Sequence, residues 1–352
     1  MGHFARCQNL ADEFAQHNHT VTLMIGPSST LPVGTEANHQ VSVLDGRSDP
    51  AEEHNSYPDN LDAIVFDLNH RQMMKEPRRL AQIVDAGCNH CDTVALIDSV
   101  GEDRFRAFGM REPAIIISPY LEADAVRPSS QSTQLMGAQY AVLNQNLRSL
   151  RCKRMDNSND GDKLKLVVSF GGSDPWKLTD RCLPVLLGQE FRHFEIAIVA
   201  GPLFGTQYRS MIEKKISEAN RPVCFVDGAK GVMELFSECD VAVIAPGLTR
   251  YELAYLGVPS VLVCPDRYFY DATQSFEQDG IASRVLADGS NFEAALEFQL
   301  QRLCSDPELR QKFSQTGLKI VDGHGARRIC DAVFNQYSAN LADAQSTVAS
   351  NG

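Results

Sequence analysis

The sequence predicts an α/β protein made of two domains, each with a parallel sheet. Short apolar runs rich in β-branched residues alternate with helix-like segments along the chain, which is typical of parallel sheets covered by helices. Two of these runs end in glycine and a hydroxyl residue before a helical pattern, as strands that lead into ligand-binding loops do. A length of 352 residues accommodates two domains of ordinary size.

The first half alternates helix and strand. Apolar residues recur at helical spacing over 4–17 and 78–86. Apolar runs between and after these segments predict strands over 21–25, 41–44, 62–67, 93–98 and 114–118.

A polar, glycine-containing segment over 156–162 predicts a linker. Strand-like runs follow over 164–170, 194–200, 223–226, 241–244 and 260–264, and helical patterns close the chain over 291–303 and 308–334. We therefore expect an N-terminal domain over 1–155, a nucleotide-binding domain over 163–337 and a flexible tail over 338–352.

The bulk properties exclude several classes of protein. Lys and Arg number 33 against 45 Asp and Glu, and the net charge of −12 disfavours nucleic acid as a partner. No apolar stretch approaches the roughly 20 residues of a membrane span, so we expect a cytoplasmic protein. Composition does not predict an oligomeric state.

Cysteine usage indicates reduced thiols and no metal centre. The ten cysteines are spread along the chain, mostly inside apolar runs. The Cys88-Asn-His-Cys91 segment has no second pair at zinc spacing, so we interpret it, with His90, as structural. We expect neither a metal nor a cofactor.

The two glycine-containing loops are the main functional signal. Glycine lets the backbone approach a ligand closely, and a following helix presents N–H groups to an anion, although a tight turn with a helix cap has the same pattern. The pair favours a diphosphate, hence a nucleotide. The candidate residues are Gly171, Gly172 and Ser173 in the first loop and Gly247, Leu248 and Thr249 in the second. Glu252 either completes a capping box with Thr249 or accepts the hydroxyls of a ribose.

Candidate chemical groups also occur in the first half. His3 follows a glycine at the mouth of a helix, where it is either a general base or an exposed histidine near a terminus. Arg6, one turn later, holds an anionic group or lies on the surface. Asp67 and Asp98 each end an apolar strand, where a carboxylate faces the cleft of a doubly wound sheet or simply caps a turn. Because His70 is near Asp67 in the sequence, the first alternative has Asp67 orient an imidazole or a substrate.

The segment over 266–274 is polar and aromatic and follows a strand, which suits a loop that faces a sugar. It contributes two further sugar-side candidates, Thr273 and Gln274.

Four stretches together resemble the nucleotide-sugar hydrolases of pseudaminic acid biosynthesis. This family is related to spore coat polysaccharide proteins and to the glycosyltransferase that makes the lipid-linked peptidoglycan precursor. The stretches are Gly2-His-Phe-Ala-Arg-Cys7, Gly137-Ala-Gln-Tyr-Ala-Val-Leu143, Val168-Ser-Phe-Gly-Gly-Ser-Asp-Pro175, and Gly247 to Glu252 followed by Leu256-Gly-Val-Pro259.

The resemblance implies two Rossmann-like domains facing across a cleft, the GT-B architecture. It also implies a UDP-sugar as substrate, cleaved between the sugar and the diphosphate by water that His3 activates. By the same resemblance, the two glycine loops match the diphosphate site, Glu252 matches the ribose-binding glutamate, and the Val226 region matches the backbone that meets uracil.

The chain departs from the family pattern at several positions. The family's first strand and the first glycine of its Gly-x-Gly-His motif would precede Met1. Asp98-Ser-Val100 replaces Asp-Asp-Tyr, Leu248 replaces a serine, Thr273 replaces an asparagine, and Asn144-Gln-Asn-Leu147 replaces Arg-Pro-Glu-Phe.

These observations predict a hydrolase that releases a free amino or deoxy sugar and UDP for surface polysaccharide or nonulosonic acid biosynthesis. Two alternatives stay open: a glycosyltransferase with a UDP-sugar donor, and a nucleotide-sugar-binding homologue without turnover.

Overall fold

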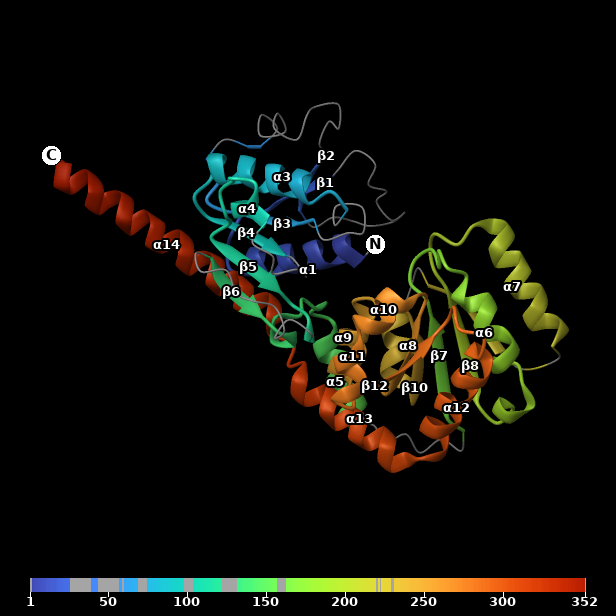
Figure 1. Cartoon of the computed structure of the whole chain (residues 1–352). Helices are drawn as coiled ribbons and strands as arrows, with labels where there is room; N and C mark the ends of the chain where they lie inside the picture. Colours follow the sequence, from blue (N-terminus) through green and yellow to red (C-terminus); the bar gives the residue numbers. More distant parts are fainter. Residues whose placement is uncertain are drawn as a thin grey trace. The chain divides into compact units, whose positions relative to one another are not determined.

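The computed structural model describes residues 2–25, 39–43, 57–58, 60–68, 75–97, 104–121, 132–156, 163–219, 221, 223–228 and 231–351. It contains two compact units (Figure 1). The C-terminal unit comprises Leu143–Asp322, and the N-terminal unit comprises His3–Val142 with Gly323–Gly352.

The N-terminal unit contains a four-stranded parallel sheet and a separate parallel pair, β1–β2. The sheet order is β3-β4-β5-β6, so each strand pairs with the next one in the chain. Its strands are β1 (Thr22–Ile25), β2 (Gln40–Val43), β3 (Ile64–Asp67), β4 (Val94–Ile97), β5 (Ile115–Ser118) and β6 (Thr133–Met136). Its helices are α1 (Gly2–Gln16), α3 (Pro77–His90), α4 (Arg104–Ala107), the short 3-10 helix η3 (Ala138–Tyr140) and α14 (Gly325–Asn351).

Two apolar clusters hold this unit together. Leu80 and Val84 of α3 pack with Val94 and Leu96 of β4. The other cluster joins Ile115, Ile117 and Leu135 of the sheet to Leu10 of α1 and to Ile329 and Val333 of α14. Residues of one β-strand alternate between faces, so β4 contributes Val94 and Leu96 to one core and Ala95 and Ile97 to the other.

The C-terminal unit is a six-stranded parallel sheet in the order β12-β11-β10-β7-β8-β9. Its strands are β7 (Lys165–Ser169), β8 (Glu195–Ala200), β9 (Val223–Asp227), β10 (Val241–Ile244), β11 (Ser260–Cys264) and β12 (Ala282–Leu286). Its helices are α5 (Leu147–Asp156), α6 (Leu178–Leu186), η4 (Gln189–Phe191), α7 (Thr206–Glu218), α8 (Val232–Glu238), α9 (Thr249–Leu256), α10 (Arg267–Asp271), α11 (Gln274–Gln278), α12 (Phe292–Ser305) and α13 (Pro307–Ile320).

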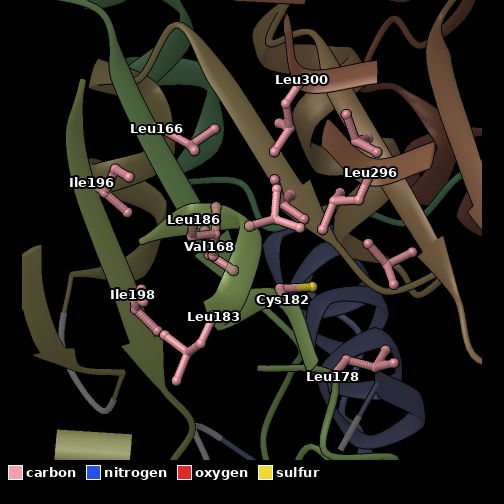
Figure 2. Packing of buried hydrophobic residues seen from close by; sticks show 14 of the residues in the cluster. Leu166, Val168, Leu178, Cys182, Leu183, Leu186, Ile196, Ile198, Leu296 and Leu300 are labelled. Carbon is pink, nitrogen blue, oxygen red and sulfur yellow. The ribbon is translucent and has the colours of Figure 1, made fainter. Parts of the chain in front are cut away.

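Figure 2 shows the main core of this unit, where side chains of α6 and α12 meet those of the central strands. Val168, Leu178, Ile198, Leu296 and Leu300 are fully buried there. Order along the sheet reverses between β7 and β10, because the chain runs outward to β9 and then returns to the other side of β7. Ligands of doubly wound sheets collect at such a switch point, beyond the carboxyl ends of the strands.

Every strand and helix predicted from the sequence is present within the described residues, and β6, β12, α4, α5, α10 and α11 were not predicted. The segment over 266–274, predicted as a loop, contains α10 and the start of α11 instead. The unit boundaries differ from the predicted ones. Helix α5 contacts α8 and α9 and so lies in the C-terminal unit, although we placed its residues before the linker. The segment over 308–334 is two helices, separated near Gly323, whose φ is +80°. Helix α14 then extends to Asn351, where a flexible tail was predicted, since alanine-rich segments favour helix.

Candidate functional site

The N-terminal unit gathers a histidine, an arginine and an aspartate at the carboxyl edge of its sheet. His3 and Arg6 lie one turn apart near the start of α1, Asp67 is the last residue of β3, and Tyr120 follows β5. The sequence predicted the first three as separate candidates, and the structure brings them together. Tyr120 was missed, because nothing local distinguishes a tyrosine that follows a buried strand.

Asp67 is the centre of this cluster. Arg6 donates from Nε to Oδ2 at 2.7 Å and from Nη2 to Oδ1 at 2.6 Å, which is a two-pronged pairing, and from Nη1 to the Tyr120 hydroxyl at 2.9 Å. Nδ1 of His3 lies 2.8 Å from Oδ1 of Asp67, and the Cys7 thiol lies 3.7 Å from Oδ2. The carboxylate is 1% exposed and the imidazole is 41% exposed.

The surroundings of Asp67, Arg6 and Cys7 determine the protonation state of each group. Burial by itself would raise the pKa of Asp67, but the hydrogen bond from His3 and the charge and hydrogen bonds of Arg6 lower it to about 2. Burial would lower the pKa of Arg6, and Asp67 with Tyr120 raises it above its ordinary value instead. Burial, reinforced by Asp67, raises the pKa of the Cys7 thiol to about 12. Asp67 and Arg6 are therefore a permanent ion pair, and Cys7 is a neutral donor.

This arrangement selects one tautomer of His3. An ionised carboxylate only accepts hydrogen bonds, so Nδ1 carries the proton and the lone pair of the neutral ring is on Nε2. A partly exposed imidazole whose ring is held by a buried carboxylate can take a proton from a bound hydroxyl or water.

The C-terminal unit places the two glycine loops beside each other. Strands β7 and β10 pair in register up to Ser169 and Ile244, so their following loops leave from adjacent positions about 5 Å apart. Gly171 has a φ of +77°, which only glycine adopts without strain. Gly171, Ser173 and Gly247 are exposed. Two loops next to each other at a switch point can hold two linked phosphates.

The helices behind these loops differ at their N-termini. Asp174 is buried and accepts from the amides of Leu178 and Thr179, both at 2.8 Å, so a carboxylate already caps α6. The sequence predicted that both helices offer N–H groups to a phosphate, and for α6 this is wrong, since Asp174 uses them. Helix α9 has no side-chain cap, so its N-terminal turn after Gly247 is the better anion position.

A third glycine shapes the first loop and was not predicted. A Cβ on Gly201, just after β8, would lie 2.2 Å from the Gly171 carbonyl oxygen and 2.3 Å from that of Gly172. The amide of Leu203 donates to the Gly172 carbonyl at 2.8 Å. The sequence signal is the same as in the other loops, an apolar strand that ends in glycine.

Glu252 lies in the first turn of α9 and is buried. Burial raises its pKa to about 7, against a smaller effect of its hydrogen bond with Thr249. The predicted capping box is wrong, because Leu248 and not Thr249 is the N-cap of α9 and no side chain caps this helix. The role as acceptor for a ribose stays a prediction.

Val226 pairs with Val199, and the amide of Gly228 donates to the Ala200 carbonyl at 2.7 Å. Alternate residues direct their backbone groups to the same side, so those of Val226 also point toward β8. The backbone of Asp227 points to the side where the described sheet has no further strand.

The sugar-side candidates Thr273 and Gln274 differ in burial. Thr273 is 1% exposed, and its hydroxyl lies 2.9 Å from the Phe269 carbonyl and 3.2 Å from that of Tyr270. Gln274 is exposed at the start of α11. Asp98 and His70 lie outside the described residues.

The described part of the chain has neither a metal-binding cluster nor a helix that could span a membrane. No group of three or more His, Cys, Asp or Glu side chains is arranged to hold a metal ion there. Among the described helices, none combines the length and apolar character needed to cross a bilayer.

Comparison with known sequences gives partial relatives. No family model matches the chain. An uncharacterised protein of Methanocaldococcus jannaschii is 28% identical over 130 residues, which are 36% of this chain and 26% of that protein. The spore coat polysaccharide biosynthesis protein SpsG of Bacillus subtilis is 21% identical over 206 residues, 58% of this chain and 59% of SpsG. The matched stretches thus span about a quarter and somewhat over half of these relatives' lengths.

Comparison with solved structures covers nearly the whole chain. MurG of Acinetobacter baumannii has a TM-score of 0.66 at 13% identity, with 95% of this chain and 96% of MurG covered. A putative UDP-N-acetylglucosamine 2-epimerase from Listeria monocytogenes has a TM-score of 0.60 at 12% identity, with 95% and 94% covered.

The spinosyn rhamnosyltransferase SpnG complexed with thymidine diphosphate has a TM-score of 0.57 at 12% identity, with 93% and 95% covered. At these identities the likeness concerns the fold. The chain is thus a two-domain α/β protein with the GT-B fold, and it is similar in sequence to a protein of spore coat polysaccharide biosynthesis.

Proposed function

We propose that this chain is an enzyme that hydrolyses a UDP-sugar to UDP and free sugar. The observation that carries the proposal is the pair of adjacent glycine loops after β7 and β10, beside the uncapped start of α9, because this combination suits a diphosphate. The relatives support the class: SpnG was solved with thymidine diphosphate, and SpsG is a polysaccharide biosynthesis protein.

In the proposed reaction, the C-terminal unit binds UDP and His3 acts as the base. Water attacks the anomeric carbon, its proton passes to Nε2 of His3, and the bond from that carbon to the diphosphate oxygen breaks. The electron pair leaves with UDP, whose charge the loops and α9 stabilise. Asp67 holds the imidazole and stabilises the imidazolium, and Arg6 holds Asp67.

On the base side, Asp227 in the Val226 region presents backbone groups to uracil, and Glu252 accepts from the ribose. The resemblance supplies the Val226 region and Glu252 for these two roles. The choice of Asp227 within that region follows from the β9 backbone, since the backbone groups of Asp227 point away from β8.

Calorimetric titration with UDP and then UMP tests nucleotide binding. We expect micromolar binding of UDP and much weaker binding of UMP, since UMP leaves one phosphate position unfilled. Turnover of UDP-sugars in H₂¹⁸O then tests the chemistry. The proposal requires the label in the sugar; label in UDP, or no binding of UDP, contradicts it.

A glycosyltransferase is the second candidate, because the titles of three structural neighbours, SpnG, WaaG and the kitacinnamycin glycotransferase, name sugar transferases. The two differ in what receives the sugar. Transfer to an added acceptor at a rate far above hydrolysis favours the transferase, and retained UDP affinity with no product favours a binding protein.

A further inference from the structure

Three aromatic side chains form a cluster next to the diphosphate loops, and the proposed reaction has not yet used them. Trp176 comes three residues after Ser173 and is 38% exposed, and Tyr268 of α10 is 53% exposed. Phe269 lies between them. Its ring centroid is 5.3 Å from that of Trp176 and 5.4 Å from that of Tyr268, both edge to face. We call Trp176, Tyr268 and Phe269 the aromatic cluster.

Hydrogen bonds and an ion pair fix helix α10, which carries two of the three rings. Asp266 caps α10 by accepting from the Phe269 amide at 3.2 Å. The buried Thr273 hydroxyl binds the carbonyls of Phe269 and Tyr270. Arg284 donates to the Tyr270 carbonyl, lies over the Tyr270 ring at 4.2 Å, and pairs with Glu277 at 2.8 Å. Tyr268 and Phe269 are therefore held on an anchored short helix, and Trp176, which precedes α6, packs against Phe269. The three rings form a pre-organised contact surface.

Sheet order places the cluster on one side of the diphosphate loops. Trp176 follows β7 and α10 follows β11, and β10 lies between these two strands. The cluster therefore flanks the loop after β10. On the far side of β7, β8 comes next and β9 ends the sheet with the Val226 region. A nucleotide sugar whose base lies toward β9 and whose diphosphate lies at β7 and β10 extends its sugar toward β11.

We propose that the aromatic cluster binds the sugar ring of the nucleotide sugar through its less polar C–H face, with Trp176 as the main contact. This inference rests on the proposed function and deepens it. Aromatic rings supply broad apolar contact at little conformational cost, and ligand sites combine such surfaces with a few polar groups. Thr273, predicted as a direct sugar contact, acts instead by positioning α10.

Trp176 is the only tryptophan of the chain, so its fluorescence reports on this surface directly. The probes are UDP, UDP-glucose and UDP-N-acetylglucosamine, with acrylamide as quencher. We expect at least one UDP-sugar to protect Trp176 from acrylamide more than UDP does. Equal protection by UDP and by both UDP-sugars overturns the inference.

Substitution gives an independent test. We expect Trp176→Ala and Phe269→Ala each to weaken binding of the protecting UDP-sugar about tenfold and to leave UDP affinity within about twofold. Phe298→Ala is the matched control, since Phe298 is 60% exposed on α12 of the same unit. Thermal unfolding shows whether each variant is folded.

The outcomes separate this inference from the proposed function. If UDP does not bind to the native chain, the proposed function fails and the inference falls with it. If UDP binds normally but the Trp176 and Phe269 variants lose UDP and UDP-sugar affinity equally, the cluster contacts the nucleotide and the sugar assignment is wrong.

Discussion

The two units differ in the chemical groups at the carboxyl edges of their sheets: backbone in one and side chains in the other. In the C-terminal unit, the loops after β7 and β10 are mainly backbone, with exposed glycines and an uncapped helix start. In the N-terminal unit, the edge is a network of side chains in which Asp67 joins Arg6, His3 and Cys7. Backbone amides bind an anion without a change in protonation, whereas His3 can accept a proton. We infer a division of labour in which one unit binds and the other reacts.

Removing the base is expected to have the largest effect. His3→Ala should lower turnover by about 10²–10⁴-fold and leave UDP affinity within about threefold, because a general base acts in the transition state more than in nucleotide binding. Initial rates and calorimetry measure the two quantities. His193→Ala, an exposed histidine of the C-terminal unit, is the control. Equal losses of turnover and UDP affinity would show that His3 is only structural.

Glu252 is a titratable side chain in the C-terminal unit, where the candidate loop residues 171–173 and 247–249 carry no titratable group. It tests whether the stability of this unit depends on pH. Its pKa of about 7 in the folded chain exceeds the ordinary 4.5, so its contribution to stability is complete below about pH 4.5 and is lost as the pH rises through 7. Glu252→Gln should therefore raise the free energy of unfolding by about 3 kcal/mol at pH 8 and have little effect near pH 4.

Urea denaturation at both pH values measures this difference. Glu218→Gln, at a side chain 63% exposed in the same unit, should show no such dependence. An unchanged pH profile in the Glu252 variant would mean that folding does not raise the pKa of this carboxyl above its ordinary value.

Gly247 tests the backbone character of the phosphate site. A Cβ at this position meets no atom within 4 Å, so Gly247→Ala should fold normally. We expect UDP affinity to fall at least about tenfold, because a methyl group keeps the phosphate away from the amides. Gly205→Ala is the matched control, since its Cβ also meets nothing within 4 Å. Full UDP affinity in the Gly247 variant would place the diphosphate elsewhere.

Chelation should have the smallest effect. The proposed mechanism stabilises the diphosphate with amides and a helix start, so EDTA is expected to leave turnover unchanged. Rates before and after dialysis against EDTA measure this. A loss of turnover that Mg²⁺ restores would show that a metal ion, and not only the amides and the helix start, stabilises the diphosphate.

The sequence by itself determined the features that are local in the chain. Strand periodicity gave both parallel sheets, and glycine after an apolar strand located the loops at Gly171 and Gly247, because the backbone conformation and close approach they need depend on nearby residues. His3, Arg6 and Asp67 were each recognisable as chemical groups.

Only the tertiary structure decided how these groups act. Asp67 contacts His3, which lies 64 positions away in the sequence. Asp174 occupies the amides at the start of α6, and Phe269 of α10 packs against Trp176, which follows a different strand. Such pairings depend on strand order and register, which no single segment encodes. The physical reason is that burial and charge at a site arise from residues that become neighbours only when the sheet is assembled.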